Sequence, residues 1–283
     1  MINQVTSLRP LSQKTFERFR KLIYQKTNIH MRDSKHILVS NRLRKRLVAL
    51  GLGSYEEYYR YLTEDDRREE EMPNFIAAVS TNETYFFRET SHFDALRESI
   101  LPDLFRRKKR LRIWSAGCSS GEEPYTLRIV LDQGAGVLWD GEAEIIATDI
   151  SCEMIRQARE GLYLDRAIRF VPPAVLHSCF VPEGSGFWRL KENLRRGVEF
   201  RVHNMLSDTP PERSFDIVFC RNVMIYFDKE TQRRLVDERF GAVLPPGGYL
   251  CIGHSESLTG ISVRFRYQRG FKAPIYLRIG EQP

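Results

Sequence analysis

The stretch Arg112-Ile-Trp-Ser-Ala-Gly-Cys-Ser-Ser-Gly-Glu-Glu-Pro-Tyr125 decides the fold of this chain. Its order of residues predicts a short buried strand, a turn of small residues and the first turn of a helix. Gly117, Ser119 and Gly121 carry no bulky side chains, so the backbone of the turn can pass close to a bound molecule. The first hypothesis is therefore a site for a nucleotide-type cofactor.

Two carboxylates at the predicted helix start narrow the choice of cofactor. A phosphate-binding loop offers a lysine or bare backbone amides, whereas Glu122 and Glu123 would repel a pyrophosphate. They suit a molecule with an ammonium or sulfonium charge, and S-adenosylmethionine carries both. The alternative is an ordinary helix start, because acidic side chains and Pro124 are both favoured in a first turn.

A second buried strand is predicted in Ala143-Glu-Ile-Ile-Ala-Thr-Asp-Ile150, an apolar run with an acid near its end. In a parallel sheet, Asp149 would present its carboxylate to a ribose diol. Asp149 follows Gly121 by 28 residues, against about 20 in the usual dinucleotide-binding pattern. The order of the two elements still favours a nucleotide-binding α/β fold.

A third strand is predicted directly before the polar residues Arg221 and Asn222. In an open parallel sheet, the carboxyl end of such a strand faces the ligand crevice. Upstream, three polar residues (Asn82, Thr84 and Arg88) interrupt an apolar stretch. They either cap and solvate a helix turn or line one wall of the cofactor pocket.

Composition limits the possible classes of protein. With 283 residues, 42% hydrophobic and 29% charged, the chain is predicted to form one large globular domain or two smaller ones. No apolar run approaches the roughly 18 residues that span a membrane, and residues 1–9 lack the apolar core of a signal peptide.

Five scattered cysteines favour reduced thiols in the cytoplasm. Neither cysteines nor histidines show ligand spacing, so we predict no metal, and we expect a monomer.

Positive charge is concentrated near the N-terminus. The net charge is +7, and residues 1–62 hold 13 Lys and Arg against 4 Asp and Glu, so the rest of the chain is slightly acidic. This asymmetry predicts a separate basic module that binds an acidic surface. Nucleic acid is a competing partner. We expect none, because the basic segment lacks interleaved aromatic residues for base stacking.

The basic module is predicted to be helical. Ser40 and Gly51 provide start and stop signals for one helix, which carries an apolar stripe of leucines. Arg42, Lys45 and Arg46 share the opposite side through i, i+3 and i+4 spacing. Basic helix faces are most often simply solvated, but three clustered cations favour a docking surface.

Three segments are predicted along the chain. Residues 1–75 form the helical docking module, residues 76–110 a linker helix with the start of the next domain, and residues 111–283 the α/β domain. From about 165 to 200, short strand-like runs and turns predict a small antiparallel insertion.

The motifs of the chain together resemble the chemotaxis receptor glutamate methyltransferase family of the CheR type. The motifs that carry the resemblance are Asn82-Glu-Thr-Tyr-Phe-Phe-Arg88, Trp114-Ser-Ala-Gly-Cys-Ser-Ser-Gly-Glu-Glu-Pro-Tyr125, Ala147-Thr-Asp-Ile150, Cys220-Arg-Asn-Val-Met-Ile-Tyr-Phe-Asp228 and Gly253-His-Ser-Glu256. They extend over nearly the whole chain. The resemblance implies a Rossmann-like S-adenosylmethionine-dependent methyltransferase sheet with a small antiparallel β insertion and an all-α N-terminal domain.

The resemblance also implies a reaction, in which S-adenosylmethionine donates a methyl group to side-chain glutamates of chemoreceptors and S-adenosylhomocysteine is the product. Glu123 would hold the methionine ammonium group, Asp149 the ribose hydroxyls, and Asn204 with Met205 the adenine. The full set of implied cofactor contacts is Asn82, Thr84, Arg88, Glu123, Asp149, Asn204, Met205, Arg221 and Asn222.

The implied partners are regions of the receptor. The basic face of Arg42, Lys45 and Arg46 would meet the acidic methylation helices. In some members of the family the inserted sheet binds a peptide at the receptor C-terminus. Residues 180–190 match that peptide-binding loop poorly.

The implied chemistry needs no general base, because a glutamate with a pKa of about 4.3 is already ionised at neutral pH. The enzyme accelerates the reaction by placing the carboxylate oxygen in line with the methyl carbon and the sulfur. We predict that the catalytic residues are Arg88, which steers the incoming carboxylate, and Tyr226, which contributes a hydroxyl or a ring face beside the sulfonium.

Two other functions remain as alternatives. One is methyl transfer to RNA or another nitrogen acceptor, but such enzymes commonly carry an Asn/Asp-Pro-Pro-aromatic turn where this chain has Arg221-Asn-Val-Met224. The other is a non-catalytic cofactor-binding protein, which the intact set of Arg88, Glu123, Asp149 and Tyr226 disfavours.

Overall fold

The computed structural model describes residues 9–135 and 141–280, and its contacts divide the chain into two units. One unit contains the described residues up to Thr81, together with Ile150–Glu153 and Tyr226–Asp228. The other contains the remaining described residues from Asn82 onward. The N-terminal residues that were assessed for a signal peptide lie largely outside the described part.

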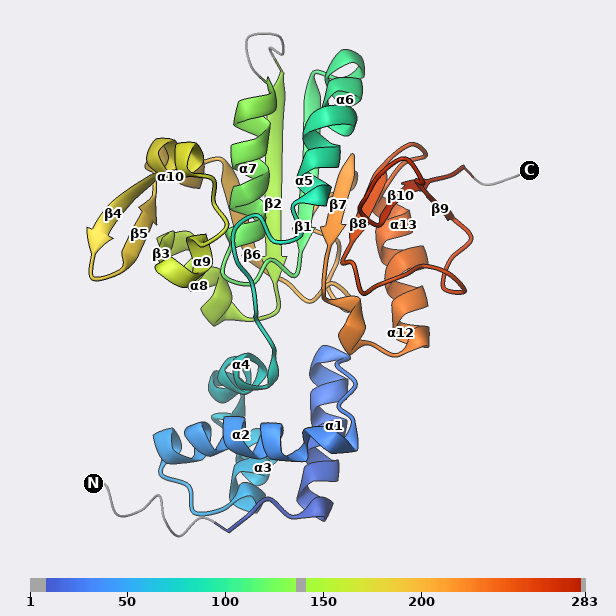
Figure 1. The fold of residues 1–283 in the computed structure, drawn as a ribbon. Coiled ribbons are helices and arrows are strands. Elements are labelled where there is room, and N and C mark those ends of the chain that lie inside the picture. Colours follow the sequence, from blue (N-terminus) through green and yellow to red (C-terminus); the bar gives the residue numbers. More distant parts are fainter. Residues whose placement is uncertain (1–8, 136–140, 281–283) are drawn as a thin grey trace. The chain divides into compact units, whose positions relative to one another are not determined.

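The N-terminal unit is built from four helices: α1 (Gln13–Thr27), α2 (His36–Leu50), α3 (Tyr55–Glu64) and α4 (Arg68–Val79), with a short 3-10 turn at Asp33–Lys35 (Figure 1). Their apolar faces enclose one core, in which Phe19, Leu47 and Phe75 are fully buried. Serine side chains begin two of the helices, since Ser12 accepts from the Thr15 N–H and Ser54 from the Glu57 N–H, both at 3.2 Å.

The helix predicted between Ser40 and Gly51 corresponds to α2. Its predicted start was wrong, and its predicted end is confirmed. Helix α2 begins at His36, and Ser40 lies inside it with its hydroxyl 3.0 Å from that of Tyr55. A serine inside a helix is therefore used here for a tertiary hydrogen bond. Gly51 ends the helix in a left-handed conformation, with φ of 69°.

The second unit is organised around a seven-stranded sheet of order β6-β2-β1-β7-β8-β10-β9 (Figure 1). Strands β6 (Val198–Val202), β2 (Glu142–Asp149), β1 (Arg110–Ala116), β7 (Ile217–Cys220) and β8 (Tyr249–Ile252) are parallel. Strands β10 (Ile275–Arg278) and β9 (Phe265–Tyr267) complete the sheet as an antiparallel hairpin. The predicted α/β class with a mostly parallel sheet is confirmed.

Helices accompany these strands in the sequence. Three helical segments precede β1: α5 (Ser91–Ala95), a π-helical segment (Leu96–Ile100) and α6 (Leu101–Arg107). Strand β1 is followed by α7 (Glu122–Ala135), and β2 is followed by α8 (Cys152–Glu160). Strand β7 is followed by α12 (Lys229–Arg233), a second π-helical segment (Arg234–Phe240) and α13 (Gly241–Val243). Figure 1 shows α6 and α7 running alongside the central strands. Among the described residues, every helix falls short of the length and apolar character needed to cross a membrane.

A small antiparallel sheet is inserted between β2 and β6. Its strands are β3 (Leu162–Leu164), β4 (Phe180–Gly184) and β5 (Phe187–Leu190), in the order β3-β5-β4, and the same region holds the short helices α9 (Asp165–Ile168), α10 (Pro173–Cys179) and α11 (Glu192–Arg195). The predicted antiparallel insertion is therefore present, and it contains helices that the strand-like pattern did not indicate.

Two glycines of the turn after β1 are required by the protein's own packing. Gly117 and Gly121 have φ values of 87° and 95°, which other residues rarely adopt. A Cβ at Gly117 would lie 2.5 Å from Val223 Cγ2, and one at Gly121 would lie 2.9 Å from the Cβ of Ala158. The small residues of this turn thus permit close packing of the loop against its protein neighbours.

We predict that Gly121→Ala lowers the free energy of unfolding by about 1–3 kcal/mol, because it adds both backbone strain and a clash with α8. The matched control is Gly134→Ala in α7, where a Cβ would make an ordinary 3.6 Å contact with Leu101. That substitution should be neutral or should stabilise by up to about 1 kcal/mol. Urea unfolding measures both changes, and equal effects would contradict this account of Gly121.

Candidate functional site

The turn after β1 and the end of β2 are joined by backbone hydrogen bonds. The N–H groups of Gly117 and Cys118 donate to the Thr148 carbonyl at 2.8 and 2.9 Å. The Ser119 N–H donates to Asp149 Oδ2 at 2.9 Å, and Asp149 is buried. The predicted ribose-binding acid is therefore held against the small-residue loop, as expected from the carboxyl ends of adjacent parallel strands.

Two predicted site residues, Glu123 and Arg221, form an ion pair. Glu123 Oε2 accepts from Arg221 Nη1 at 3.1 Å, and Glu123 Oε1 accepts from the Ser115 hydroxyl at 2.7 Å. The Arg221 side chain is only 2% exposed, whereas that of Glu123 is 13% exposed. The carboxylate is therefore fixed by two donors while part of it still faces solvent.

Glu89 is a site residue that the sequence reasoning missed. Its carboxylate accepts from Arg221 Nη2 at 3.1 Å and from Asn222 Nδ2 at 3.2 Å. Burial raises the pKa of Glu89, but the charge of Arg221 and the hydrogen bonds from Asn222 and Arg221 outweigh burial, so the net pKa is lowered. The signal available in the sequence was its place directly after the Asn82–Arg88 motif.

A second missed acid, Glu256, holds the turn after β7. Its carboxylate accepts from the backbone N–H groups of Asn222, Ile225 and Gly253 at 3.0, 3.2 and 2.6 Å. Burial raises the pKa of Glu256, and these backbone hydrogen bonds oppose the rise. The motif Gly253-His-Ser-Glu256 contributed to the resemblance, but the sequence assigned no role to its acid.

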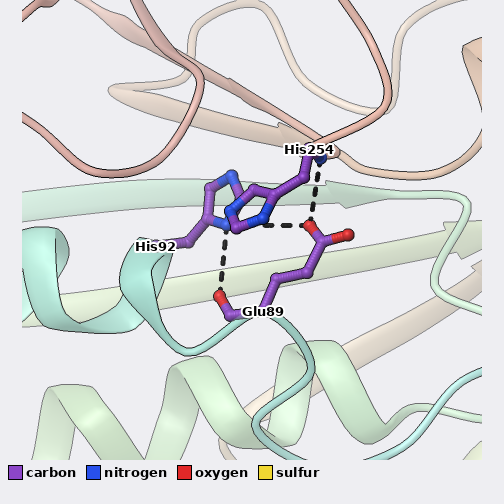
Figure 2. A group of neighbouring side chains, drawn as sticks. All are labelled: Glu89, His92 and His254. Atoms are coloured by element: carbon purple, nitrogen blue, oxygen red, sulfur yellow. Dashed lines mark hydrogen bonds and ion pairs between the residues drawn. The ribbon is translucent and has the colours of Figure 1, made fainter.

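Spacing along the sequence predicted no metal, yet the fold brings Glu89, His92 and His254 together (Figure 2). One possible ligand atom from each lies within 4.8 Å of the others. However, the Glu89 carboxylate already accepts from three nitrogen donors, those of Arg221, Asn222 and the His254 backbone. His92 Nε2 lies 2.7 Å from the Ile252 carbonyl oxygen, which can only accept, so this nitrogen is a donor. These contacts describe a hydrogen-bonded charge cluster.

Backbone strain is concentrated in the segments that meet here. In the described part of the chain, six residues other than glycine have positive φ, and four of them lie in these segments: Phe87 (58°), Glu89 (54°), Ser119 (50°) and Asn222 (58°). Such conformations cost energy and persist only where surrounding contacts enforce them. Their convergence supports the hypothesis that this edge of the sheet is the functional site.

A cavity of about 610 Å³ borders the small-residue loop. Its lining includes the predicted residues Asn82 and Thr84, with Ser120 from the turn after β1 and Glu122 from the start of α7. The Ser119 hydroxyl also donates to the Asn82 carbonyl at 3.2 Å. The segment that precedes α5 is thus brought to the loop after β1. The lining of this cavity does not include Glu123, Asp149 or Arg221, so a place for Asn82 and Thr84 in the cofactor pocket stays a prediction.

Comparison with known families matches both parts of the chain. The all-alpha domain of the CheR methyltransferases matches residues 14–80, and their S-adenosylmethionine-binding domain matches residues 82–272. The chain belongs to the CheR methyltransferase family. Its resemblance to that family, predicted from the motifs, is confirmed, and the chain is an S-adenosylmethionine-dependent methyltransferase. The two alternative functions are not favoured.

Curated relatives match the chain over most of their length. Chemotaxis protein methyltransferase 2 of Pseudomonas aeruginosa is 42% identical over 257 residues, which cover 89% of each chain. Chemotaxis protein methyltransferase 2 of Vibrio cholerae is 36% identical over 95% of this chain and 94% of its own. The chemotaxis protein methyltransferase of Escherichia coli is 37% identical over 94% of this chain and 92% of its own.

The remaining predicted site residues of this CheR methyltransferase lie in different surroundings. Met205 is buried, and its Cε lies 3.7 Å from the position of a Cβ built on Gly117. Asn204 Oδ1 accepts from the Leu206 N–H at 3.0 Å, so its side chain also stabilises its own turn. Arg88 donates to the Glu83 carbonyl. Tyr226, by its contacts, belongs to the N-terminal unit, and its catalytic role stays a prediction.

The three predicted docking cations of α2 differ in their use. Arg42 Nη1 donates to the carbonyls of Val79 and Ser80, both at 2.9 Å, at the end of α4. Arg46 makes two hydrogen bonds, of 2.8 and 2.7 Å, to the carboxylate of Glu71, which is 3% exposed. Both arginines therefore hold the helical unit together, while Lys45 is exposed.

Glu122 is the buried acid beside the cavity, and burial raises its pKa to about 7. Its carboxylate accepts from the Ser120 hydroxyl at 2.8 Å. The pKa of Glu122 in the folded protein therefore lies above the value of about 4.3 expected in the unfolded chain. The contribution of the protonated carboxyl to the free energy of unfolding is fully present below about pH 4.3 and is lost as the pH rises through 7.

We predict that this loss is on the order of 2–3 kcal/mol between pH 5 and pH 8, and that Glu122→Gln removes it. Glutamine keeps an acceptor for Ser120 but carries no titrating proton. Urea unfolding of both proteins at the two pH values measures the difference, with Glu98→Gln at an exposed site as the control. An unchanged pH dependence in Glu122→Gln would show that another group is responsible.

Proposed function

We propose that this methyltransferase transfers a methyl group from S-adenosylmethionine to side-chain glutamates of chemoreceptors, forming glutamate methyl esters in sensory adaptation. The observation that supports this most directly is the match of both domains to one family, whose near full-length relatives are named chemotaxis methyltransferases. The carboxylates of Asp149, at the end of β2, and Glu123, at the start of α7, are consistent with binding of this cofactor.

The residues at the sheet edge fit S-adenosylmethionine in charge and hydrogen-bonding capacity. When bound, the cofactor supplies an electrophilic methyl group on a sulfonium sulfur. Asp149 would accept from the ribose hydroxyls, Glu123 would pair with the ammonium group, and Met205 would pack against the adenine near Asn204. The Arg221 Nε is buried and has no hydrogen-bond partner among the described residues, so the guanidinium retains an N–H for a carboxylate acceptor.

The acceptor step depends on placement rather than on proton transfer. A receptor glutamate is ionised at neutral pH, so its oxygen can attack directly. Arg88 is partly exposed and is anchored through the Glu83 carbonyl, which suits it to orient an incoming carboxylate without pairing with it tightly. A catalytic role for Tyr226 is proposed from the resemblance to the family alone.

The proposed partners are the acidic methylation helices of the receptor, with Lys45 as an exposed contact on α2. A receptor C-terminal peptide is a second proposed contact, at the edge strand β4 of the small sheet. Pro182 lies within that strand, where the pairing register also shifts, so β4 offers a shortened run of donors. The receptor region that carries the glutamates is expected to place this enzyme in the cytoplasm, as a monomer that neither inserts into membranes nor binds nucleic acid.

The reaction is tested by incubating the protein with methyl-labelled S-adenosylmethionine and receptor-rich membranes, with RNA in a parallel assay. We expect base-labile label on the receptor, as methyl esters require. A receptor whose acceptor glutamates are replaced by alanine is the control and should stay unlabelled. The proposal would be refuted by label in RNA, or by S-adenosylmethionine that binds without transferring its methyl group.

Arg88→Ala is expected to lower kcat by about 10²-fold or more and to change cofactor affinity by less than about threefold, because the side chain acts on the acceptor. Methylation kinetics and calorimetry with S-adenosylhomocysteine measure the two effects separately. Arg88→Lys keeps the charge and should recover part of the rate. Equal losses of rate and affinity would remove the steering role.

Lys45→Glu is expected to raise the KM for the receptor by about three- to tenfold through charge repulsion, with the KM for S-adenosylmethionine unchanged. The matched control is Lys14→Glu, at an exposed position of α1. Initial rates at varied receptor concentration give the comparison. If both variants behave like the unmodified enzyme, the receptor docks elsewhere. Arg42 and Arg46 are unsuitable for this test, since their replacement would also disturb the helical unit.

A further inference from the structure

Arg221 is a buried cation that depends on two acids from distant parts of the chain. Its Nη1 donates to Glu123 on α7, and its Nη2 donates to Glu89 and to the backbone carbonyl of Arg88. A guanidinium that is 2% exposed has lost nearly all contact with water, so these acceptors must compensate for its desolvation. Glu123, Arg221 and Glu89 together carry a net charge of −1.

Glu89 is itself held from several directions. Its carboxylate accepts from Asn222 at 3.2 Å and from the backbone N–H of His254 at 3.3 Å. The rings of His92 and His254 stack beside it with centroids 5.2 Å apart (Figure 2). Glu89 therefore has little freedom to move away from Arg221.

His92 anchors this arrangement as a neutral side chain. Burial, followed by the nearby charge of Arg221, lowers the pKa of His92 to about 3. Its Nε2 donates to the carbonyl of Ile252 at the end of β8. The segment that carries Glu89 is thus tied to the sheet by a neutral donor, which adds no positive charge beside Arg221.

We propose that Glu89 is a positioning residue for cofactor binding. Acting through Arg221, it holds the Glu123 carboxylate in the orientation that receives the ammonium group of S-adenosylmethionine. This inference rests on the role proposed for Glu123. Without the charge of Glu89, Arg221 is compensated by Glu123 alone, and Glu123 is drawn into that pair at the expense of the ammonium group.

The test compares two molecules that differ in the group concerned. S-adenosylhomocysteine carries the ammonium group, whereas methylthioadenosine keeps the adenosine thioether and lacks the amino-acid portion. For Glu89→Gln, we expect affinity for S-adenosylhomocysteine to fall by about tenfold or more, and affinity for methylthioadenosine to change by less than about twofold. Glu89→Asp retains the charge and should recover part of the loss. Glu98→Gln, at an exposed position, is the control for a neutralised surface acid.

Calorimetric titration of the full chain gives outcomes that separate the possibilities. Equal losses for both molecules would overturn the proposal in favour of a general structural role for Glu89. Unchanged affinity for both would overturn it as well. Loss of S-adenosylhomocysteine binding by the unmodified protein after treatment with EDTA would replace it with a metal centre at Glu89, His92 and His254.

Glu123→Gln distinguishes this inference from the proposed cofactor role on which it rests. If the unmodified protein fails to bind S-adenosylhomocysteine, the cofactor assignment itself is wrong. If the protein binds it and Glu123→Gln binds equally well, the role of Glu123 is wrong. If Glu123→Gln weakens binding and Glu89→Gln does not, only the positioning role of Glu89 is refuted.

Discussion

The buried guanidinium of Arg221 is the constraint on which the candidate site depends. It lies between Glu123, at the start of the helix after β1, and Glu89, in the segment before α5. Taking a cation out of water costs several kcal/mol unless acceptors surround it. The position of Arg221 at the end of β7 therefore requires both acids, and the backbone carbonyl of Arg88, to converge there.

The parallel sheet makes this convergence possible. Strands β1, β2, β7 and β8 run in the same direction, so their carboxyl ends meet at one edge. Asp149 is the last residue of β2, and Asn222 and Glu256 follow β7 and β8; their side chains form hydrogen bonds with neighbouring loops. Left-handed backbone at Ser119 and Asn222 turns the chain sharply enough for the loops to make those bonds.

The helical unit uses its cations differently from what a basic helix face suggests. Arg46 makes two hydrogen bonds to Glu71, an acid that also accepts from the Tyr58 hydroxyl at 2.8 Å. Arg42 satisfies carbonyls at the carboxyl end of α4, where a positive charge is favoured by the helix dipole. Spacing along one helix reveals which side chains share a face, but it does not reveal which partner another helix brings to that face.

The sequence by itself determined the α/β class, the strand–turn–helix around Gly117, the acid at the end of β2 and the family. Each of these follows from motifs whose residues lie close together in the chain. Only the tertiary structure decided that Glu89 pairs with Arg221, 132 residues away, and that Glu123 shares the same guanidinium. Local patterns report periodicity, turn chemistry and motif spacing. Which charged groups neutralise one another inside the protein depends on how distant segments pack, and a single sequence does not state that.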